Sequence, residues 1–353
     1  MKYKVVVFGV KDTSENIVSF IQEEICPVDL VITISPEVTK KNQISGYKGL
    51  SVLTEKYGIP VHEADSYFLT DEKTQKLMRE NEFNIGISMG WQRLMPKSVL
   101  DCFKYGVFGF HGNSGYLPFG RGRSPLNWSM ILGDTRFNLN LFRYDEKADS
   151  PNIFATEMFS ITPHDDIRTA QYKNMICSKH LIRRLLTAYE SGKVEVRTES
   201  KDFDSWYEKR TAADGKIDFH NRTRDIYNLI RGVAAPFPGA FAFCKGEEVR
   251  VWEAHPFDEM IDFSDFAPGE VIDVFDGRPV VRTGDGSLSS DRYASSLMLA
   301  AHDILEKYGD RQCAPGQIRY GNKRFLPEQI RHGGWMTIWI RENRYAYCMC
   351  WAA

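Results

Sequence analysis

Residues 107–149 read VFGFHGNSGYLPFGRGRSPLNWSMILGDTRFNLNLFRYDEKAD. An apolar run over residues 105–110 predicts a strand that delivers His111 to its end, and a second run over residues 137–142 predicts a strand that leads toward Asp149. In open α/β sheets, functional sites are built at the carboxyl ends of the strands. We therefore expect one imidazole and one carboxylate to meet at this edge of a sheet.

The connection between these two strands carries a basic glycine loop and a helix start. The loop is Gly120-Arg121-Gly122-Arg123, and Ser124 and Pro125 then suit the N-cap and first position of a helix. The loop either binds a phosphate or forms a tight turn with two solvated arginines. Asn113 is likewise open to two interpretations, a loop-forming residue or a catalytic amide.

Strands and helices alternate before this segment. Apolar, β-branched runs are typical of strands buried on both faces of a parallel sheet, and here they cover residues 2–9, 29–34 and 85–89. Helical periodicity lies between them, at residues 17–25, 50–57 and 71–81. The pattern predicts an α/β fold with a doubly wound parallel sheet. The first turn, residues 9–12, lacks the spaced glycines of a dinucleotide site.

The pattern of predicted secondary structure changes in the C-terminal part of the chain. Short strands follow one another closely, at residues 241–243, 249–252, 270–274 and 279–282, which predicts a small antiparallel, β-barrel-like domain. We expect a helix over residues 294–307. The predicted division is a catalytic domain at 1–205, a linker and OB-like barrel at 206–310, and an unplaced aromatic extension at 311–353.

Composition excludes several classes of function. With 353 residues and a net charge of −2, the chain fits two domains and shows no bulk affinity for nucleic acid or an anionic membrane. It has no apolar run long enough to cross a bilayer, and its seven scattered cysteines suit reduced thiols, so we expect a cytoplasmic protein. Metal sites are not expected: Asp165 and Asp166 suit helix capping, and Cys348 and Cys350 with His332 lack a second cysteine pair.

The motifs together resemble the 10-formyltetrahydrofolate-dependent formyltransferases, the family of methionyl-tRNA, glycinamide ribonucleotide and sugar N-formyltransferases. The resemblance covers residues 1 to about 290. Its central motifs are Gly109-Phe110-His111, Leu117-Pro118, Arg121-Gly122, Gly133-Asp134 and Asp145-Glu146-Lys147-Ala148-Asp149. Residues 207–218 and 231–241 resemble the junction into the family's C-terminal barrel. The resemblance implies a Rossmann-like formyltransferase core followed by that barrel.

The resemblance also implies a set of site residues. His111 is expected to act as general base and acid, with Asp149 orienting it and favouring its charged form. The formyl donor, 10-formyltetrahydrofolate, is expected at a pocket that includes Met89, Gly90, Trp91, Leu94 and Asp145. Gly109 is a departure, because the family has a catalytic Asn there. Asn113, a backbone N–H or His111 itself would have to replace that donor.

The amine that accepts the formyl group is expected to be small. After Trp206 acidic and basic residues are nearly equal in number, which argues against tRNA, and residues 210–215 are similar to the sugar formyltransferases. We expect a nucleotide-linked amino sugar of polysaccharide biosynthesis, with Arg121, Arg123 or Arg210 at its phosphates. The alternatives are a methionyl-tRNA or other small-amine formyltransferase, a formyltetrahydrofolate hydrolase, and a non-catalytic folate or sugar-nucleotide binding protein. A homodimer is possible, and the sequence does not determine the oligomeric state.

Overall fold

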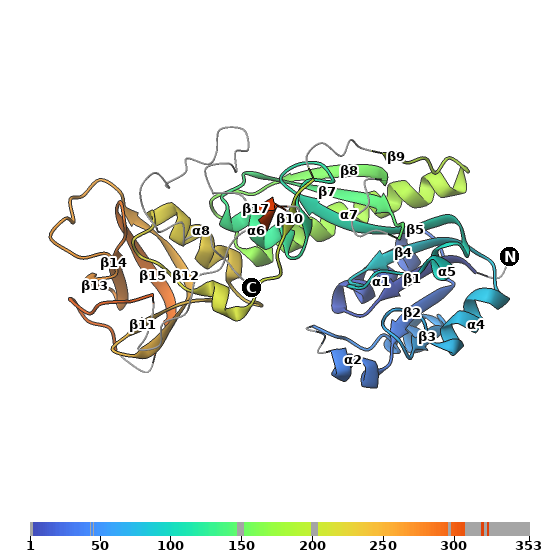
Figure 1. The fold of residues 1–353 in the computed structure, drawn as a ribbon, viewed down its shortest axis with the longest axis horizontal. Helices are drawn as coiled ribbons and strands as arrows, with labels where there is room; N and C mark the ends of the chain where they lie inside the picture. The colour runs from blue at the N-terminus through green and yellow to red at the C-terminus, as the bar shows by residue number, and fades with distance from the viewer. Residues whose placement is uncertain are drawn as a thin grey trace. The chain divides into compact units, whose positions relative to one another are not determined.

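The computed structural model describes residues 3–42, 44, 46–146, 152–198, 204–295 and 298–307, together with the backbone of 319–320 and 323–324. The chain divides into two compact units that alternate along the sequence (Figure 1). Unit 1 comprises residues 1–121, 138–159 and 173–203, and unit 2 comprises residues 122–137, 160–172 and 204–353. The predicted domain limit at residue 205 falls where the last stretch of unit 2 begins, but two earlier stretches also group with unit 2.

Unit 1 is built around one eight-stranded sheet of order β3-β2-β1-β4-β5-β7-β8-β9. Its strands are β1 (Tyr3–Gly9), β2 (Leu30–Ile34), β3 (Val61–Ala64), β4 (Phe83–Met89), β5 (Phe103–Asn113), β7 (Arg136–Arg143), β8 (Asn152–Ser160) and β9 (Arg197–Thr198). The helices are α1 (Asp12–Glu24), α2 (Pro36–Asn42), α3 (Val52–Tyr57), α4 (Glu72–Glu80), α5 (Lys97–Leu100) and α7 (Ile167–Glu190), of which α7 begins in unit 2.

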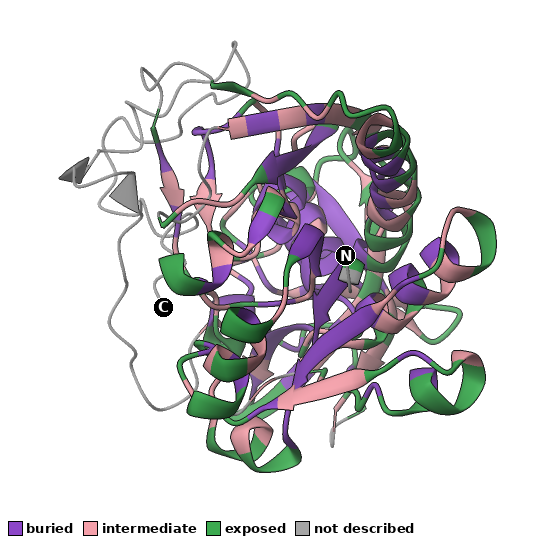
Figure 2. Cartoon of the chain, turned by 90° about the vertical axis from the view of Figure 1, so that its right-hand side faces the viewer, coloured by how far each residue is buried: buried purple, intermediate pink, exposed green. Residues whose placement is uncertain are grey.

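The parallel part of this sheet confirms the α/β prediction. β1 pairs in parallel with β2 and β4, β3 with β2, and β5 with β4. β7 departs from the pattern, because it pairs antiparallel to β5, so the sheet is mixed. Residues such as Val7 and Ile32 are completely buried, which explains the continuous apolar runs, and Figure 2 shows the strands of unit 1 mainly in the colour of buried residues.

One face of the sheet carries a core that is important for the site. It combines Phe8 of β1, Val107 of β5 and Trp91 with apolar residues of α4 and α5. Glycine at position 86 is required on this face, since a Cβ there would lie 2.9 Å from Val107 and 3.2 Å from Phe8. β5 therefore presents Val107, and the alternate residues that follow it, to this packed face.

Unit 2 contains the predicted antiparallel sheet, of order β11-β12-β15-β14-β13. Its strands are β11 (Ala240–Cys244), β12 (Glu247–Asp258), β13 (Val271–Phe275), β14 (Arg278–Arg282) and β15 (Ser287–Ala294). The other elements are α6 (Pro125–Ile131), η1 (Ala212–Gly215), α8 (Thr223–Val233) and the short strands β10 (Trp206–Tyr207), β16 (Arg319–Tyr320) and β17 (Lys323–Arg324). The short strand β6 (Arg121–Gly122) begins at the last residue of the first stretch of unit 1 and ends at the first residue of unit 2. The buried side of α8 is Ile226, Leu229, Ile230 and Val233, as its periodicity predicts.

The five-stranded sheet does not close into a barrel, because within the described residues its edge strands β11 and β13 do not pair. Residues 302–306 connect the two edges instead. The backbone N–H of Phe243 donates to the carbonyl of Glu306 at 2.7 Å, and the N–H of Leu305 donates to the carbonyl of Gly269 at 2.7 Å. These bonds satisfy backbone groups that a sheet edge would otherwise expose.

The same bonds explain why one prediction is wrong. Residues 294–307 have helical apolar spacing, but the described part of this range contains no helix. Backbone pairing with β11 and with residues 269–271 has overridden the local preference. Across the described part of the chain, no helix is both long and apolar enough to span a membrane.

Candidate functional site

His111 lies on β5, in the middle of the sheet of unit 1. It is 8% exposed, and its Nε2 atom lies 2.7 Å from the carbonyl oxygen of Gly120. A carbonyl oxygen only accepts hydrogen bonds, so Nε2 is the donor. The strand does not end at His111 as predicted, since antiparallel pairing with β7 extends it to Asn113. The imidazole is thus fixed by regular backbone on one side and by a loop carbonyl on the other.

Buried amides surround this position. His111 pairs with Asn140 of β7, and Asn113 pairs with Asn138, so the four side chains share one face of the two strands. The Thr156 hydroxyl donates to the Asn140 side-chain oxygen at 2.7 Å. Desolvated amides are costly unless they are hydrogen-bonded, which makes this buried polar group a candidate for a functional role. One sequence pattern indicates this group of buried amides, the alternation Asn138-Leu139-Asn140 in β7.

The nitrogen and the oxygen of the Asn113 side-chain amide both form hydrogen bonds with the loop that follows β5. Its nitrogen donates to the carbonyl of Phe119, and its oxygen accepts from the N–H of Gly115 at 2.6 Å. The side chain is completely buried. In this arrangement Asn113 shapes the loop that places Gly120 against His111.

The segment after β4 was predicted to line the donor pocket. Met89 ends β4, where its carbonyl accepts from the Ser14 hydroxyl at 2.6 Å, and Gly90 turns the chain with φ 75°. The Trp91 ring packs in the core, 5.0 Å from the ring of Tyr67. Leu94 is 51% exposed. The backbone of this segment therefore follows the carboxyl end of β4, whereas the Trp91 side chain serves the core.

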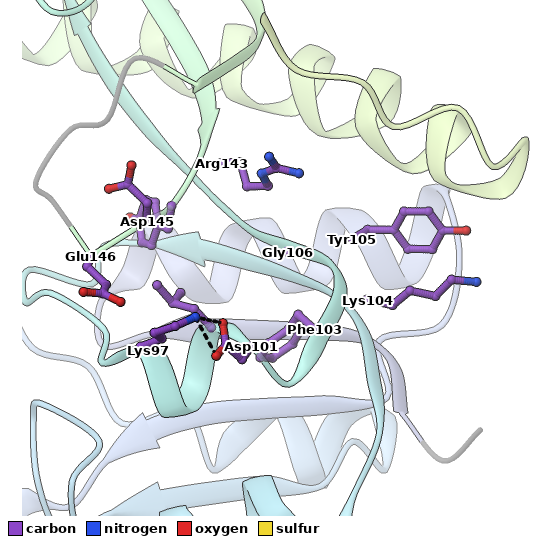
Figure 3. A pocket seen from close by; sticks show the side chains of 11 residues that line it. Lys97, Asp101, Phe103, Lys104, Tyr105, Gly106, Arg143, Asp145 and Glu146 are labelled. Atoms are coloured by element: carbon purple, nitrogen blue, oxygen red, sulfur yellow. Dashed lines mark hydrogen bonds and ion pairs between the residues drawn. The ribbon is translucent and has the colours of Figure 1, made fainter. Parts of the chain in front are cut away.

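A pocket of about 420 Å³ lies in unit 1 between α5 and the end of β7. Figure 3 shows the side chains that line it, with Lys97 of α5 and Asp101, the residue after α5, joined by two 2.7 Å contacts. Asp145 and Glu146 line it from the segment after β7, and Tyr144 is also a lining residue. Of the predicted cofactor residues, Asp145 lines this pocket, whereas Met89, Gly90, Trp91 and Leu94 do not. The mixed charges give it donors and acceptors for a polar heterocycle.

Gly109 lies two residues before His111, where the family resemblance leads us to expect an Asn. A Cβ at this position would overlap the hydroxyl oxygen and two ring carbons of Tyr144. The Tyr144 hydroxyl donates to the Ser88 side-chain oxygen at 3.2 Å. The tyrosine therefore occupies the space that any side chain at position 109 would need.

The basic glycine loop forms a tight turn. Gly120 and Gly122 have φ values of 68° and 102°, in the region that favours glycine. A Cβ on Gly122 would also overlap the Tyr207 carbonyl, to which the N–H of Arg123 donates at 3.0 Å. Arg123 is exposed and Arg121 is half-buried. α6 begins at Pro125 as predicted, but Ser124 caps it without a side-chain hydrogen bond.

Arg210 lines a separate pocket of about 150 Å³ within unit 2. Its guanidinium lies 5.5 Å from the centroid of the Trp128 ring, and it donates to the Asp214 carbonyl at 3.1 Å. Burial lowers the pKa of Arg210 to about 10, which still leaves it charged at neutral pH. Ser124 and Thr211 add hydroxyls to the lining, and the lining residues include no carboxylate. The pocket suits an anionic group.

Other predicted residues fall elsewhere. Asp149, Cys348, Cys350 and His332 lie outside the described residues, as does most of the 311–353 extension. Asp166 caps α7 by accepting from the N–H of Thr169 at 2.8 Å, as predicted. Within the described part of the chain, no group of three or more His, Cys, Asp or Glu could hold a metal ion.

Comparison with known proteins adds an independent observation. Residues 209–308 match the family model described as formyl transferase, C-terminal domain. Similar solved structures include WlaRD, a sugar 3N-formyltransferase determined in the presence of dTDP and 5-N-formyl-THF. That match has a TM-score of 0.60 and 16% identity, and it covers 85% of this chain and 100% of WlaRD. Residues 209–308 thus match the C-terminal domain of the formyl transferases, and the chain shares the fold of a sugar N-formyltransferase structure.

Two further structures share this formyltransferase fold. The N-formyltransferase from Helicobacter canadensis, in complex with folinic acid and dTDP-3-aminofucose, matches with a TM-score of 0.59 and 15% identity over 82% of this chain and 98% of that one. HypX from Aquifex aeolicus, in complex with tetrahydrofolic acid, matches with a TM-score of 0.56 and 16% identity over 84% of this chain and 45% of that one. At these identities the likeness establishes the fold, and the chemistry must come from the residues.

Proposed function

We propose that this formyltransferase moves a formyl group from 10-formyltetrahydrofolate to the amine of a nucleotide-linked amino sugar. The observation that carries the proposal is the buried His111, held among amides on the central strands of a formyltransferase fold. Two matched structures contain a folate together with dTDP or a dTDP-linked amino sugar, which favours this substrate class over tRNA. The nearly balanced charge of the chain points in the same direction.

The residues of unit 1 fit the donor. A pterin ring presents several N–H and C=O groups, and the pocket beside α5 offers Asp145, Glu146 and Arg143 as partners. We propose that this pocket, bordered in sequence by the segment after β4, holds the pterin. When bound, the donor supplies an activated formyl carbon.

His111 is proposed as the group that exchanges protons with the amine. An amine attacks only when unprotonated, and imidazole titrates in the range where it can remove a proton and return it. Nε2 donates to the Gly120 carbonyl, and this carbonyl stabilises the imidazolium that forms when the ring takes up a proton. Asp149 is proposed to support the same charged form.

Arg210 is proposed to bind the substrate's diphosphate. Its guanidinium lies over the Trp128 ring and lines a pocket whose lining residues include no carboxylate, which supports an anionic ligand there. Arg121 and Arg123, on either side of Gly122, are proposed as secondary phosphate partners.

A substrate panel tests the proposal. Thymidine and uridine diphosphate sugars, each with and without an amino group, are incubated with 10-formyltetrahydrofolate, and both donor consumption and the formylated product are measured. Consumption that requires an amino sugar nucleotide supports transfer. Consumption without any amine would identify a hydrolase, formylation of charged initiator tRNA would identify the tRNA enzyme, and donor binding with no turnover would identify a binding protein.

A further inference from the structure

On the face of β5 that carries His111, the position two residues before the histidine is Gly109, which has no side chain. Gly109 pairs with Ser88 of β4 and with Phe142 of β7, in the centre of the sheet. A glycine in a central strand weakens it unless something must approach the backbone closely. Here that group is Tyr144, whose hydroxyl and ring edge fill the space of a side chain at position 109.

The position of this phenol relative to His111 follows from strand geometry. Residues 109 and 111 point to the same face, and their Cα atoms are about 7 Å apart along the strand. The Tyr144 hydroxyl lies where the Cβ of residue 109 would be, so it stands on the His111 face. Tyr144 also lines the pocket beside α5. One side chain therefore connects the proposed donor pocket with the strand face that carries the imidazole.

The chemistry of the phenol suits a hydrogen-bond donor. Tyr144 is half-buried, and its hydroxyl donates to the Ser88 hydroxyl at 3.2 Å. Both groups can act as donor or acceptor, so Ser88 can donate to the tyrosine oxygen while the phenol O–H turns toward a ligand. Such a donor is preorganised, because the ring is fixed by packing 5.2 Å from the ring of Phe142.

We propose that Tyr144 is a catalytic residue whose hydroxyl donates a hydrogen bond to the formyl oxygen during transfer. This inference rests on the proposed function. The amine nitrogen forms a bond to the formyl carbon, and negative charge then develops on the formyl oxygen. The bond from that carbon to N10 of the donor breaks, and the proton that the amine loses to His111 ends on N10. Tyr144 stabilises the charge without exchanging a proton.

Kinetics of Tyr144→Phe test the role of the hydroxyl. This variant keeps the ring that fills the space above Gly109 and removes only the donor. Loss of one donor to a developing oxyanion lowers kcat by about 100- to 1000-fold. We expect that loss, with KM for both substrates and the shape of the pH profile unchanged. Tyr172→Phe, at an exposed tyrosine of α7, is the matched control and is expected to behave as wild type.

Thermal unfolding without any ligand tests the placement separately. Gly109→Asn is expected to lower the melting temperature by roughly 2–10 °C, because the new side chain overlaps Tyr144. In a Tyr144→Ala background the same substitution is expected to cost much less, since the space is then open. An equal cost in both backgrounds would show that the two positions do not share this space and would overturn the proposal.

The outcomes separate this inference from the proposed function. A wild-type protein that formylates no amine in the substrate panel overturns the proposed function, and the catalytic role of Tyr144 with it. An active wild type whose Tyr144→Phe variant keeps kcat within twofold overturns only the inference about Tyr144. An active wild type with a large kcat loss and unchanged KM in that variant supports both.

Discussion

The imidazole Nε2 of His111 donates a hydrogen bond of 2.7 Å to the carbonyl oxygen of Gly120. This contact fixes the tautomer of the neutral ring, because a carbonyl cannot donate. It also couples the histidine to the basic glycine loop, whose φ of 68° at Gly120 determines where the carbonyl points. The loop thus orients His111 independently of any role it has in binding phosphate.

Replacement of His111 by Ala is expected to lower kcat by about 100- to 10,000-fold, the usual contribution of a general acid–base group. Donor affinity, measured by calorimetry, should change little, because His111 does not line the pocket beside α5. His164→Ala is the matched control at an exposed histidine. Near-normal turnover in His111→Ala would rule out the proposed mechanism.

Arg210→Ala is expected to weaken binding of the nucleotide sugar by roughly 10- to 100-fold, the value of one charge-assisted hydrogen bond. Arg210→Lys should recover only part of this affinity, since an ammonium lacks the planar fork that pairs with phosphate and stacks on Trp128. Titration with the nucleoside diphosphate alone measures both effects. Arg224→Ala, at an exposed arginine of α8, provides the control. Equal affinities for all four proteins would exclude Arg210 from the anion site.

Asp218 is expected to make the stability of the protein depend on pH. Burial alone would raise its pKa, but the ammonium of Lys307, 3.0 Å away, and hydrogen bonds from Lys307 and His220 lower the pKa below its ordinary value. The ionised carboxylate therefore stabilises the folded state above about pH 4, and this contribution is lost as the pH falls through the lowered pKa.

Asp218→Asn should accordingly be less stable than wild type at pH 7, and the difference should shrink as the pH is lowered below about 4. Urea unfolding at several pH values measures it. Asp265→Asn, at an exposed aspartate, is the comparison. A difference that stays constant from pH 7 to pH 2 would contradict the assignment.

Asp166→Ala is expected to destabilise the protein by about 1 kcal/mol, because it removes the N-cap of the 24-residue helix α7. Chemical denaturation gives the free energy of unfolding. Gln171→Ala, at an exposed position on the same helix, is expected to stay within about 0.5 kcal/mol of wild type. If both variants cost the same, the hydrogen bond to Thr169 is not a stabilising cap.

Much of the architecture was predictable because apolar residues in the sequence occupy the buried positions of the strands and helices. Val5 to Val7 are buried on both faces of a parallel strand, which requires a continuous apolar run, and the period of α8 directly marks its packed side. β15 was missed for the opposite reason. Ser287, Ser289 and Ser290 are buried in it, so neither apolar content nor alternation revealed a strand.

Site residues were predictable only where the neighbouring sequence marks them. His111 follows an apolar strand and is visible as such, whereas the relation of Tyr144 to Gly109 depends on the register between β5 and β7. A residue 35 positions away fills the space left by a glycine, and no local pattern encodes that. The same holds for Arg210 and Trp128, which meet only in the folded unit 2.

The alternation of the two units along the chain restricts how this protein can be taken apart. The polypeptide passes between them five times, after residues 121, 137, 159, 172 and 203. A single proteolytic nick at any of these points cannot separate the two units cleanly, because at least one of the two fragments contains parts of both. A graft that exchanged only residues 209–308 for those of another family member would discard the native partners of Trp128 and α6, so a chimera needs residues 122–137 and 160–172 from the same parent.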